Sequence, residues 1–300
     1  MERAGSEAQE PTGNHLPGQA PMMPGAVRLR VADLARMREF YERAIGLRAL
    51  DEGEGAFRLG VDGTVVVELV SSPGAPERPP RTTGLFHLAI LVPGRAPLAR
   101  ALTRAAGAGW RQSGASDHLV SEALYLNDPE GNGIEIYRDR PRSEWRHDGG
   151  DLQMSTLPLD LDGVLGELDE SGATEAGMEA RTRIGHVHLN VADIGEAEDF
   201  YAGLLGFDVT VRGYPGALFL SSGGYHHHIG VNTWAGPGAR AQPADSRGLV
   251  WFELLVEDEA AVEELRARLE GAGVEAEAVA GGVLTRDPSG NRILIRSQAH

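Results

Sequence analysis

The 300-residue chain contains no cysteine, few aromatic residues and no long apolar run. Without cysteine, disulfides and thiolate chemistry are excluded, so any bound metal must be held by His, Asp or Glu. No apolar run approaches the roughly 20 residues that a membrane span needs. Positive charge is also scarce, because 28 Lys and Arg stand against 44 Asp and Glu. The resulting formal net charge of −16 argues against binding to nucleic acid or to an anionic membrane surface.

The first residues differ in composition from the rest of the chain. Residues 1–24 are rich in Gly, Pro, Glu and Ala, and they lack the basic start and apolar block of a signal peptide. We expect this segment to be a disordered tail and the protein to be cytoplasmic. Over the whole chain, 41% hydrophobic and 24% charged residues are typical of a soluble globular protein.

An internal repeat organises the remaining sequence. Residues 27–47 recur as residues 187–207, at a constant offset of 160 residues and without a gap. Each copy predicts an alternating strand, an Asp that caps a helix (Asp33 and Asp193), an amphipathic helix, and a glycine just after the helix end.

A second pair of related units is interleaved with the first, and both units end in an Asp-Pro-x-Gly-Asn turn. The sequence therefore predicts an α+β protein of four βαβββ modules. Their expected bounds are residues 25–72, 82–140, 182–235 and 247–298. The first two modules would form a domain of residues 25–140 and the last two a domain of residues 182–298. Residues 141–181 would form a linker with a short helix near Leu161 to Leu168.

One carboxylate stands in an unusual position. Glu135 lies between Ile134 and Ile136 in a predicted strand, so it faces the side opposite to the isoleucines. If both faces of the strand are covered, an ionised Glu there is costly unless something positive, such as a metal ion, meets it. If the strand is half-buried, the carboxylate simply faces solvent.

The four modules, with their Phe-Tyr…Gly segments and Asp-Pro-x-Gly-Asn turns, resemble the vicinal oxygen chelate superfamily (glyoxalase/bleomycin resistance/dioxygenase). The resemblance implies that modules join in pairs into two half-open barrels of mixed sheet. It also implies that first-strand histidines and a last-strand glutamate bind a metal, and the matching residues are His87, His186 and Glu135. Two imidazoles and one carboxylate form the facial triad of non-haem Fe(II) oxygenases, and the same ligands suit Mn(II). The alternative is that both histidines are hydrogen-bonded core residues.

The triad requires a particular pairing of the modules. Modules one and four have no histidine at the first-strand position. We therefore predict that module two faces module three, and that modules one and four pair as a metal-free barrel. A linker of about 40 residues is long enough to allow this arrangement. The competing assembly is a glyoxalase-like site that uses Glu68, His87 and Glu135.

The finer resemblance is to two-domain extradiol catechol 2,3-dioxygenases. It implies that His118 and Tyr125 hold the catechol oxygens and that His228 is the acid–base histidine. Strand alternation is expected to place His226 and His228 on one face of the three-histidine run. We expect His188 and His226 to lie behind the metal ligands and to orient them. The alternatives are that the three-histidine run lies on the surface, and that Tyr125 is an ordinary aromatic residue of the core.

The predicted reaction is the cleavage of catechol, or a substituted catechol, by O2 at a mononuclear Fe(II), to a 2-hydroxymuconic semialdehyde-type product. Mn(II) is the alternative metal. The predicted partners are a small aromatic diol and O2, with no nucleic acid and no membrane, and a homo-oligomer is left open. Two other classes stay open. A glyoxalase-type isomerase or lyase would need a second inward carboxylate near the triad, and a binding protein for a small aromatic molecule or antibiotic would need no metal.

Overall fold

The computed structural model describes residues 20–53, 56–149, 151–168 and 177–298. Most of the expected N-terminal tail, residues 1–19, lies outside the described residues. The boundary predicted at residue 24 is wrong, because Met22 already begins the first strand. Met22 and Met23 pair with Val256 and Leu255 of a strand near the C-terminus, and a register shift follows at Pro24.

Each of the four modules consists of one strand, one helix and three further strands, as the sequence predicts. Module one contains β1 (Met22–Val31), α1 (Leu34–Phe40) with a π-helical turn (Tyr41–Ile45), β2 (Arg48–Gly53), β3 (Ala56–Val61) and β4 (Thr64–Ser71). Module two contains β5 (Gly84–Leu91), α2 (Arg95–Gly107), β6 (Gly114–Asp117), β7 (Ser121–Asn127) and β8 (Gly133–Asp139). Module three contains β12 (Arg183–Asn190), α4 (Ile194–Glu198) with a π-helical turn (Asp199–Leu204), β13 (Asp208–Val211), β14 (Ala217–Ser221) and β15 (Ile229–Asn232). Module four contains β16 (Gly248–Val256), α5 (Glu259–Gly271), β17 (Ala276–Val279), β18 (Gly282–Arg286) and β19 (Arg292–Ser297).

The repeated helices begin and end as their sequence indicates. A carboxyl oxygen of Asp33, and likewise of Asp193, accepts the backbone N–H three residues on, at 3.0 Å in both cases. These hydrogen bonds satisfy one of the free N–H groups of the first turn. Gly46 and Gly206 follow the helix ends with φ values of +93° and +88°, a conformation that glycine adopts without strain.

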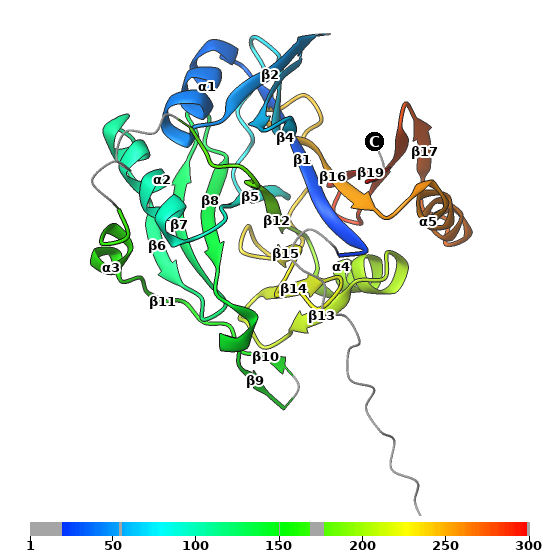
Figure 1. Ribbon diagram of the computed structural model, residues 1–300. Coiled ribbons are helices and arrows are strands. Elements are labelled where there is room, and N and C mark those ends of the chain that lie inside the picture. The colour runs from blue at the N-terminus through cyan, green and yellow to red at the C-terminus, as the bar shows by residue number, and fades with distance from the viewer. Residues whose placement is uncertain (1–19, 54–55, 150, 169–176, 299–300) are drawn as a thin grey trace, which may run out of the picture.

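Two large curled sheets form the body of the protein (Figure 1). The first has the order β17-β18-β19-β16-β1-β4-β3-β2 and combines modules four and one. The second has the order β11-β6-β7-β8-β5-β12-β15-β14-β13 and combines modules two and three. Antiparallel pairing of β5 with β12 joins the two halves of the chain in the second sheet. The predicted pairing of module two with module three is therefore confirmed, whereas the predicted domains of residues 25–140 and 182–298 are wrong, because each sheet combines one module from either of them.

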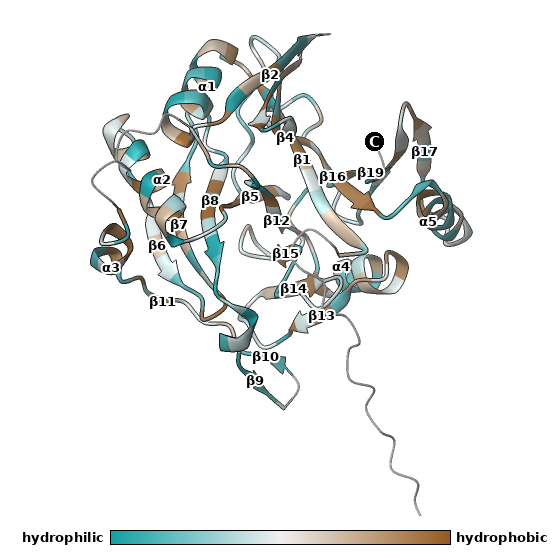
Figure 2. Ribbon diagram, in the orientation of Figure 1, coloured by the Kyte–Doolittle hydropathy of each residue, from teal (hydrophilic) through white to brown (hydrophobic). Residues whose placement is uncertain are grey.

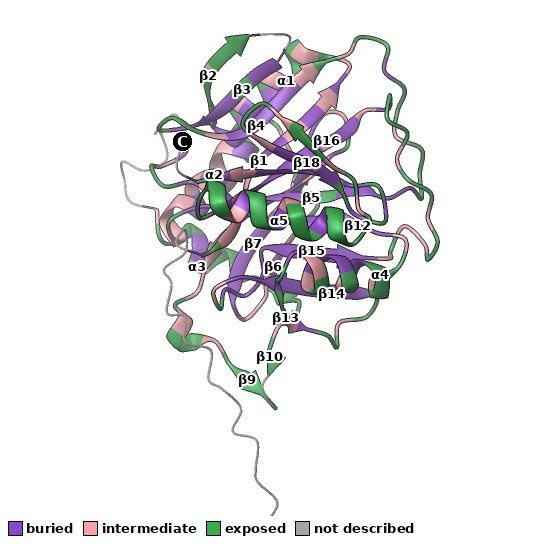
Figure 3. Ribbon diagram, turned by 90° about the vertical axis from the view of Figure 1, so that its right-hand side faces the viewer, coloured by how far each residue is buried: buried purple, intermediate pink, exposed green. Residues whose placement is uncertain are grey.

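The central strands of the second sheet, β5, β8 and β12, are buried on both faces. Leu88, Ile90 and Ile136 belong to the large hydrophobic core, together with Leu98 of α2. Their neighbours in the strands, such as Ala89, point to the opposite face and line the interior of the curled sheet. Figure 2 shows apolar residues concentrated on strands such as β16, and Figure 3 shows buried strands behind the exposed outer face of α5.

The segment between modules two and three does more than connect them. It contains a 3-10 turn (Arg142–Glu144), β9 (His147–Asp148), β10 (Asp151–Leu152), β11 (Leu157–Pro158) and α3 (Leu161–Leu165). The short helix α3 lies where the sequence predicts it, although it is shorter than expected. β11 pairs with β6 and so becomes the edge of the second sheet, which the sequence did not predict. None of the helices in the described residues is both long and apolar enough to cross a membrane.

Candidate metal centre

The candidate metal centre lies on the inner face of the second sheet, where three neighbouring strands carry its residues. Ala89 of β5 pairs with Glu135 of β8 on one side and with His186 of β12 on the other. His87 lies two residues before Ala89 and therefore shares its face. Because the side chain of Ala89 is a single methyl group, Glu135 and His186 can reach toward a common point, which His87 also approaches.

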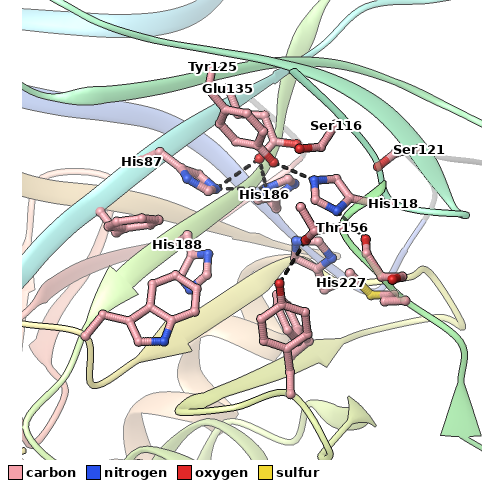
Figure 4. Close-up of a pocket in the computed structure, with 16 residues that line it drawn as sticks. His87, Ser116, His118, Ser121, Tyr125, Glu135, Thr156, His186, His188 and His227 are labelled. Atoms are coloured by element: carbon pink, nitrogen blue, oxygen red, sulfur yellow. Dashed lines mark hydrogen bonds and ion pairs between the residues drawn. The ribbon is translucent and has the colours of Figure 1, made fainter. Parts of the chain in front are cut away.

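The three ligand atoms form a nearly equilateral triangle (Figure 4). Glu135 Oε2 lies 3.1 Å from His87 Nε2 and 3.2 Å from His186 Nε2, and the two nitrogen atoms are 3.3 Å apart. For metal–ligand bonds of ~2.1 Å, ligand atoms are ~3.0 Å apart at right angles and ~3.4 Å apart at tetrahedral angles. The observed triangle therefore fits a divalent cation bound on one face, and all three residues are buried.

The electrostatics of the triad match metal binding. Burial alone would raise the pKa of Glu135, but its hydrogen bonds with His186 and His87 hold this pKa well below its usual value. Burial lowers the pKa of His186 to about 4, against the opposing effect of Glu135. The carboxylate is therefore ionised and the His186 imidazole neutral near pH 7, which are the forms that bind a metal.

The equivalent glutamate of module one has a different environment. Glu68 belongs to β4 in the first sheet and forms ion pairs with Arg28 at 3.4 Å and with Arg58 at 3.0 Å. The competing assembly of Glu68 with His87 and Glu135 is therefore not formed. Two arginines occupy the position that a cation would take beside Glu68.

His118 and Tyr125 lie together beside the triad, as the sequence predicts. His118 occupies the tight turn between β6 and β7. Its Nδ1 is 2.7 Å from the carbonyl oxygen of Ser155, which can only accept, so Nδ1 carries the proton. His118 Nε2 then accepts the Tyr125 hydroxyl at 2.6 Å. Burial and the charge of Glu135 raise the pKa of Tyr125 well above its usual value, which keeps the hydroxyl protonated.

The three-histidine run lies in a loop and not in the predicted strand, although His226 and His228 still share one side, where both rings pack on Tyr225 with centroids 4.0 and 4.8 Å away. Residues 222–228 form a loop rather than a strand, because Gly223 and Gly224 turn the chain with φ values of +65° and +69°. As a result His227 lines the cavity, and His228 does not. His228 Nδ1 instead accepts the backbone N–H of Ser222 at 3.2 Å, so His228, the acid–base histidine that the resemblance implies, does not line this cavity.

A chain of polar contacts connects Asp139 to His227 through His226, outside the cavity. Asp139 Oδ1 lies 2.9 Å from His226 Nε2, and His226 Nδ1 lies 2.8 Å from His227 Nδ1. When His226 is neutral and donates from Nε2 to Asp139, its Nδ1 must accept, so His227 donates from Nδ1. His227 Nε2 is then left without a proton. His226 therefore contacts His227, and no hydrogen bond joins it to a metal ligand within the described residues.

His188 lies in the cavity wall beside the triad (Figure 4). Its ring meets that of His87 edge-on, with ring centroids 5.0 Å apart, and its Nε2 is buried without a hydrogen-bond partner in the described part of the chain. Burial, followed by the neighbouring His87 and His186, lowers the pKa of His188 well below its usual value. His188 therefore contacts His87 through ring packing, and no hydrogen bond joins the two within the described residues.

The cavity above the triad has a volume of about 190 Å³. Several of its lining residues were not predicted from the sequence. Phe86 and Phe219 lie in β5 and β14, and the others come from loops and from the segment between the modules: Met154, Ser155, Thr156, Tyr214, His227 and Trp234. Phe86 and Trp234 are partly exposed and meet edge-on with ring centroids 5.2 Å apart. A hydrogen bond of 2.8 Å between Thr156 and Tyr214 joins the segment to module three across the cavity.

Comparison with known proteins agrees with this architecture. The profile of the Glyoxalase/Bleomycin resistance protein/Dioxygenase superfamily matches residues 24–136 and 183–295. A catechol-2,3-dioxygenase from Bacillus subtilis (strain 168) is 41% identical over 269 residues, which cover 88% of this chain and 93% of that protein.

Solved structures show the same fold at lower identity. A Bacillus subtilis protein superposes with a TM-score of 0.66 at 14% identity, over 94% of this chain and 86% of that one. Glyoxalase I from Zea mays superposes with a TM-score of 0.57 at 15% identity, over 91% and 92% of the two chains. At these identities the structures establish the fold alone. From its sequence matches, the chain belongs to the Glyoxalase/Bleomycin resistance protein/Dioxygenase superfamily and is an enzyme similar to catechol-2,3-dioxygenase.

Proposed function

We propose that the protein is an extradiol dioxygenase that cleaves catechol, or a substituted catechol, with O2 to a 2-hydroxymuconic semialdehyde-type product. The observation that carries the proposal is the triangle of His87, Glu135 and His186 in the wall of an aromatic-lined cavity. Two neutral imidazoles and one carboxylate are the ligands of mononuclear non-haem Fe(II) oxygenases. We propose Fe(II) as the metal, and Mn(II) as the alternative that the same ligands accept.

The metal, held by His87, Glu135 and His186, would supply Lewis acidity toward the two catechol oxygens and a route for electrons between catechol and O2. The chain itself orients the substrate. Tyr125 stays protonated and is therefore able to donate a hydrogen bond to a catechol oxygen. His118 is fixed in one tautomer by Ser155, so its Nε2 is able to accept from a substrate hydroxyl once Tyr125 turns away.

We assign the proton transfer to His227 and not to His228. Catechol and O2 together have the composition of the ring-opened product, so a base that takes a proton from catechol must return it. Burial, with His186 and His226 nearby, lowers the pKa of His227 well below its usual value, so its imidazole is neutral. Its Nε2, unprotonated in the arrangement described above, is the atom that would take and return this proton.

The aromatic lining of the cavity favours a flat aromatic substrate. Phe86 and Trp234 at its exposed edge, and Phe219 and Tyr214 on module three, surround the space beside the triad. Apart from Glu135, no Asp or Glu of the described residues lines this cavity. A glyoxalase-type isomerase needs a second carboxylate there as its base, which disfavours that class. A binding protein without metal would not need the buried triad.

Oxygen uptake tests the proposal. Protein loaded anaerobically with Fe(II) should consume one O2 per catechol added and form a yellow ring-opened product, and the metal-free protein should do neither. Iron-loaded protein that consumes no O2 with catechol or with alkyl-substituted catechols would remove the proposed activity. A cytoplasmic location and a homo-oligomeric state stay predictions.

A further inference from the structure

A second cavity, outside the metal centre, lies between the first sheet and the start of β5. Its volume is about 130 Å³, and the loop of residues 241–244 covers it. Three arginines line it: Arg30 of β1, Arg286 at the end of β18 and Arg292 at the start of β19. Arg286 and Arg292 are cross-strand partners and therefore lie side by side. No Asp or Glu of the described residues lines this cavity.

The positive charge of this cavity is not neutralised by ion pairs. None of the three arginines forms a salt bridge within the described ranges, although the chain as a whole carries a formal charge of −16. Arg30 donates to the carbonyl oxygen of Ala244, which holds the cavity wall but does not cancel its charge. Glu275 and Glu277 lie in an adjoining cleft that Arg286 and Arg292 also line. Their negative charges reduce the repulsion between the arginines, although neither glutamate forms a salt bridge with them in the described ranges.

Two polar groups of this cavity lack the partners that burial normally requires. Arg292 Nε is buried and has no hydrogen-bond partner among the described residues, and the same holds for Gln242 Oε1. Gln242 Nε2 donates to the carbonyl oxygens of Arg247 and Leu249, both at 3.3 Å, which directs Oε1 to the opposite side. A buried donor and a buried acceptor without partners are costly and are rare in folded proteins.

We propose that this cavity binds a small oxyanion, a carboxylate or a phosphate, between Arg30, Arg286 and Arg292, with Gln242 Oε1 accepting a hydrogen bond from a hydroxyl of the ligand. The ligand class follows from the groups present. Guanidinium groups bind carboxylate and phosphate oxygens through paired hydrogen bonds. An unpartnered amide oxygen requires a donor, which a hydroxy acid or hydrogen phosphate carries. The volume admits only a few heavy atoms, since a water molecule takes ~30 Å³ in the liquid.

The electrostatics of Arg292 agree with this site. Burial and the charge of Arg286, with a smaller effect from Arg30, lower the pKa of Arg292, and Glu277 only partly opposes them. A bound anion would remove this repulsion. The site borders two of the three strands that carry the triad, because Thr83 and Gly84 lie at the start of β5 and Asn291 Nδ2 donates to the Asn190 carbonyl oxygen at the end of β12. Binding is therefore expected to raise the unfolding temperature.

Calorimetric titration of the full chain tests the site with three probes: inorganic phosphate, glycolate and acetate, each at constant ionic strength against sodium chloride. Phosphate or glycolate should bind saturably and raise the unfolding temperature, and the comparison of the two assigns the anion class. Arg292→Gln and Arg286→Gln should weaken binding at least about tenfold. The matched control is Arg212→Gln, which removes an exposed, ion-paired arginine elsewhere and should bind as the unmodified protein does.

Three results would overturn the proposal. One is a response to phosphate and glycolate that does not exceed the response to chloride. Another is an equal affinity of the unmodified protein and of both arginine variants for phosphate or glycolate. Any bound phosphate would then lie at the metal centre and not in this cavity. Acetate binding as tightly as glycolate would remove the contact assigned to Gln242. Arg286 is exposed, so its variant tests the site even if Arg292→Gln does not fold, and metal content should be unchanged in Arg286→Gln.

Discussion

Replacing Asp139 by Asn tests whether Asp139 determines which nitrogen of His227 carries the proton. Asp139 lies at the end of β8, two residues beyond the barrel-lining Tyr137, and does not itself line the cavity. Its Oδ1 is 2.9 Å from His226 Nε2, and its carboxylate also accepts the Tyr225 hydroxyl at 2.9 Å. An amide at position 139 keeps the size of the side chain but removes the charge. It also permits the amide nitrogen to face His226, which would then have to accept at Nε2 and donate at Nδ1.

The expected loss follows from that one contact. A hydrogen bond to a charged group contributes about 1.5–3 kcal/mol, and about 1.4 kcal/mol corresponds to a tenfold change in rate. If the tautomer of His227 depends on Asp139, kcat should fall by about 10- to 100-fold, and the metal content should stay unchanged. Tyr225→Phe is the matched control. It removes the hydrogen bonds of the Tyr225 hydroxyl to the same carboxylate and to Tyr137 but keeps the ring that packs on His226, and we expect less than about a threefold change in kcat.

The assay is steady-state oxygen uptake with catechol, on protein whose iron content has been measured for each variant. A change in kcat with little change in KM is expected, because neither Asp139 nor His226 lines the cavity. Two outcomes would refute the reasoning: Asp139→Asn with unaltered kcat, or a Tyr225→Phe variant that is impaired as strongly as Asp139→Asn. Loss of iron from Asp139→Asn would show that Asp139 supports the metal centre and not His227.

Three further predictions concern other parts of the chain. Glu135→Gln should lose the metal, whereas Glu68→Gln should retain it. Glu68→Gln should also lower the free energy of unfolding by about 1–3 kcal/mol in a urea titration, since two arginines lose their carboxylate. Metal retention by Glu135→Gln, or metal loss by Glu68→Gln, would contradict the assignment. His227→Ala should keep the metal and slow oxygen uptake by about 100-fold or more, and His228→Ala should slow it far less; the reverse order would return the acid–base role to His228. Burial raises the pKa of Asp287 to about 6, so its contribution to stability is complete below its unfolded pKa and is lost as the pH rises through about 6. The difference in unfolding free energy between the unmodified protein and Asp287→Asn should therefore fall by up to about 3 kcal/mol from pH 4 to pH 7, and a difference that grows with pH would refute the sign.

The architecture could be predicted because its signals are local and repeated. Asp33 and Asp193 cap helices at the same offset, and Gly46 and Gly206 end them, so each module is recognisable without knowledge of its neighbours. The pairing of module two with module three is not local. It followed from the single requirement that His186 must meet ligands from the other half of the chain.

The candidate metal ligands were predictable for a related reason. His87, Glu135 and His186 lie in strands, where the register fixes which way a side chain points, and their positions recur between modules. In contrast, the three-histidine run lies in a loop, where the sequence does not indicate which side of the run faces the cavity. The adjacent Gly223 and Gly224 are the signal that could have indicated a turn there.

The walls of the cavity could not be predicted, because they depend on contacts between distant segments. Ser155 fixes the tautomer of His118 through its backbone carbonyl, which any residue at position 155 would supply. Thr156 reaches Tyr214 only because β11 joins the edge of the second sheet. No residue pattern in either segment encodes such a contact.

The central claim is that imidazoles from both halves of the chain, with one carboxylate, hold a single metal ion. Iron content per chain, measured after anaerobic reconstitution of His186→Ala and His188→Ala, tests it most directly. The two residues lie in the same strand and line the same cavity, but only His186 is within 3.2 Å of Glu135. We predict one iron per chain in the unmodified protein and in His188→Ala, and almost none in His186→Ala. Full iron content in His186→Ala, or equal loss in both variants, would contradict the account.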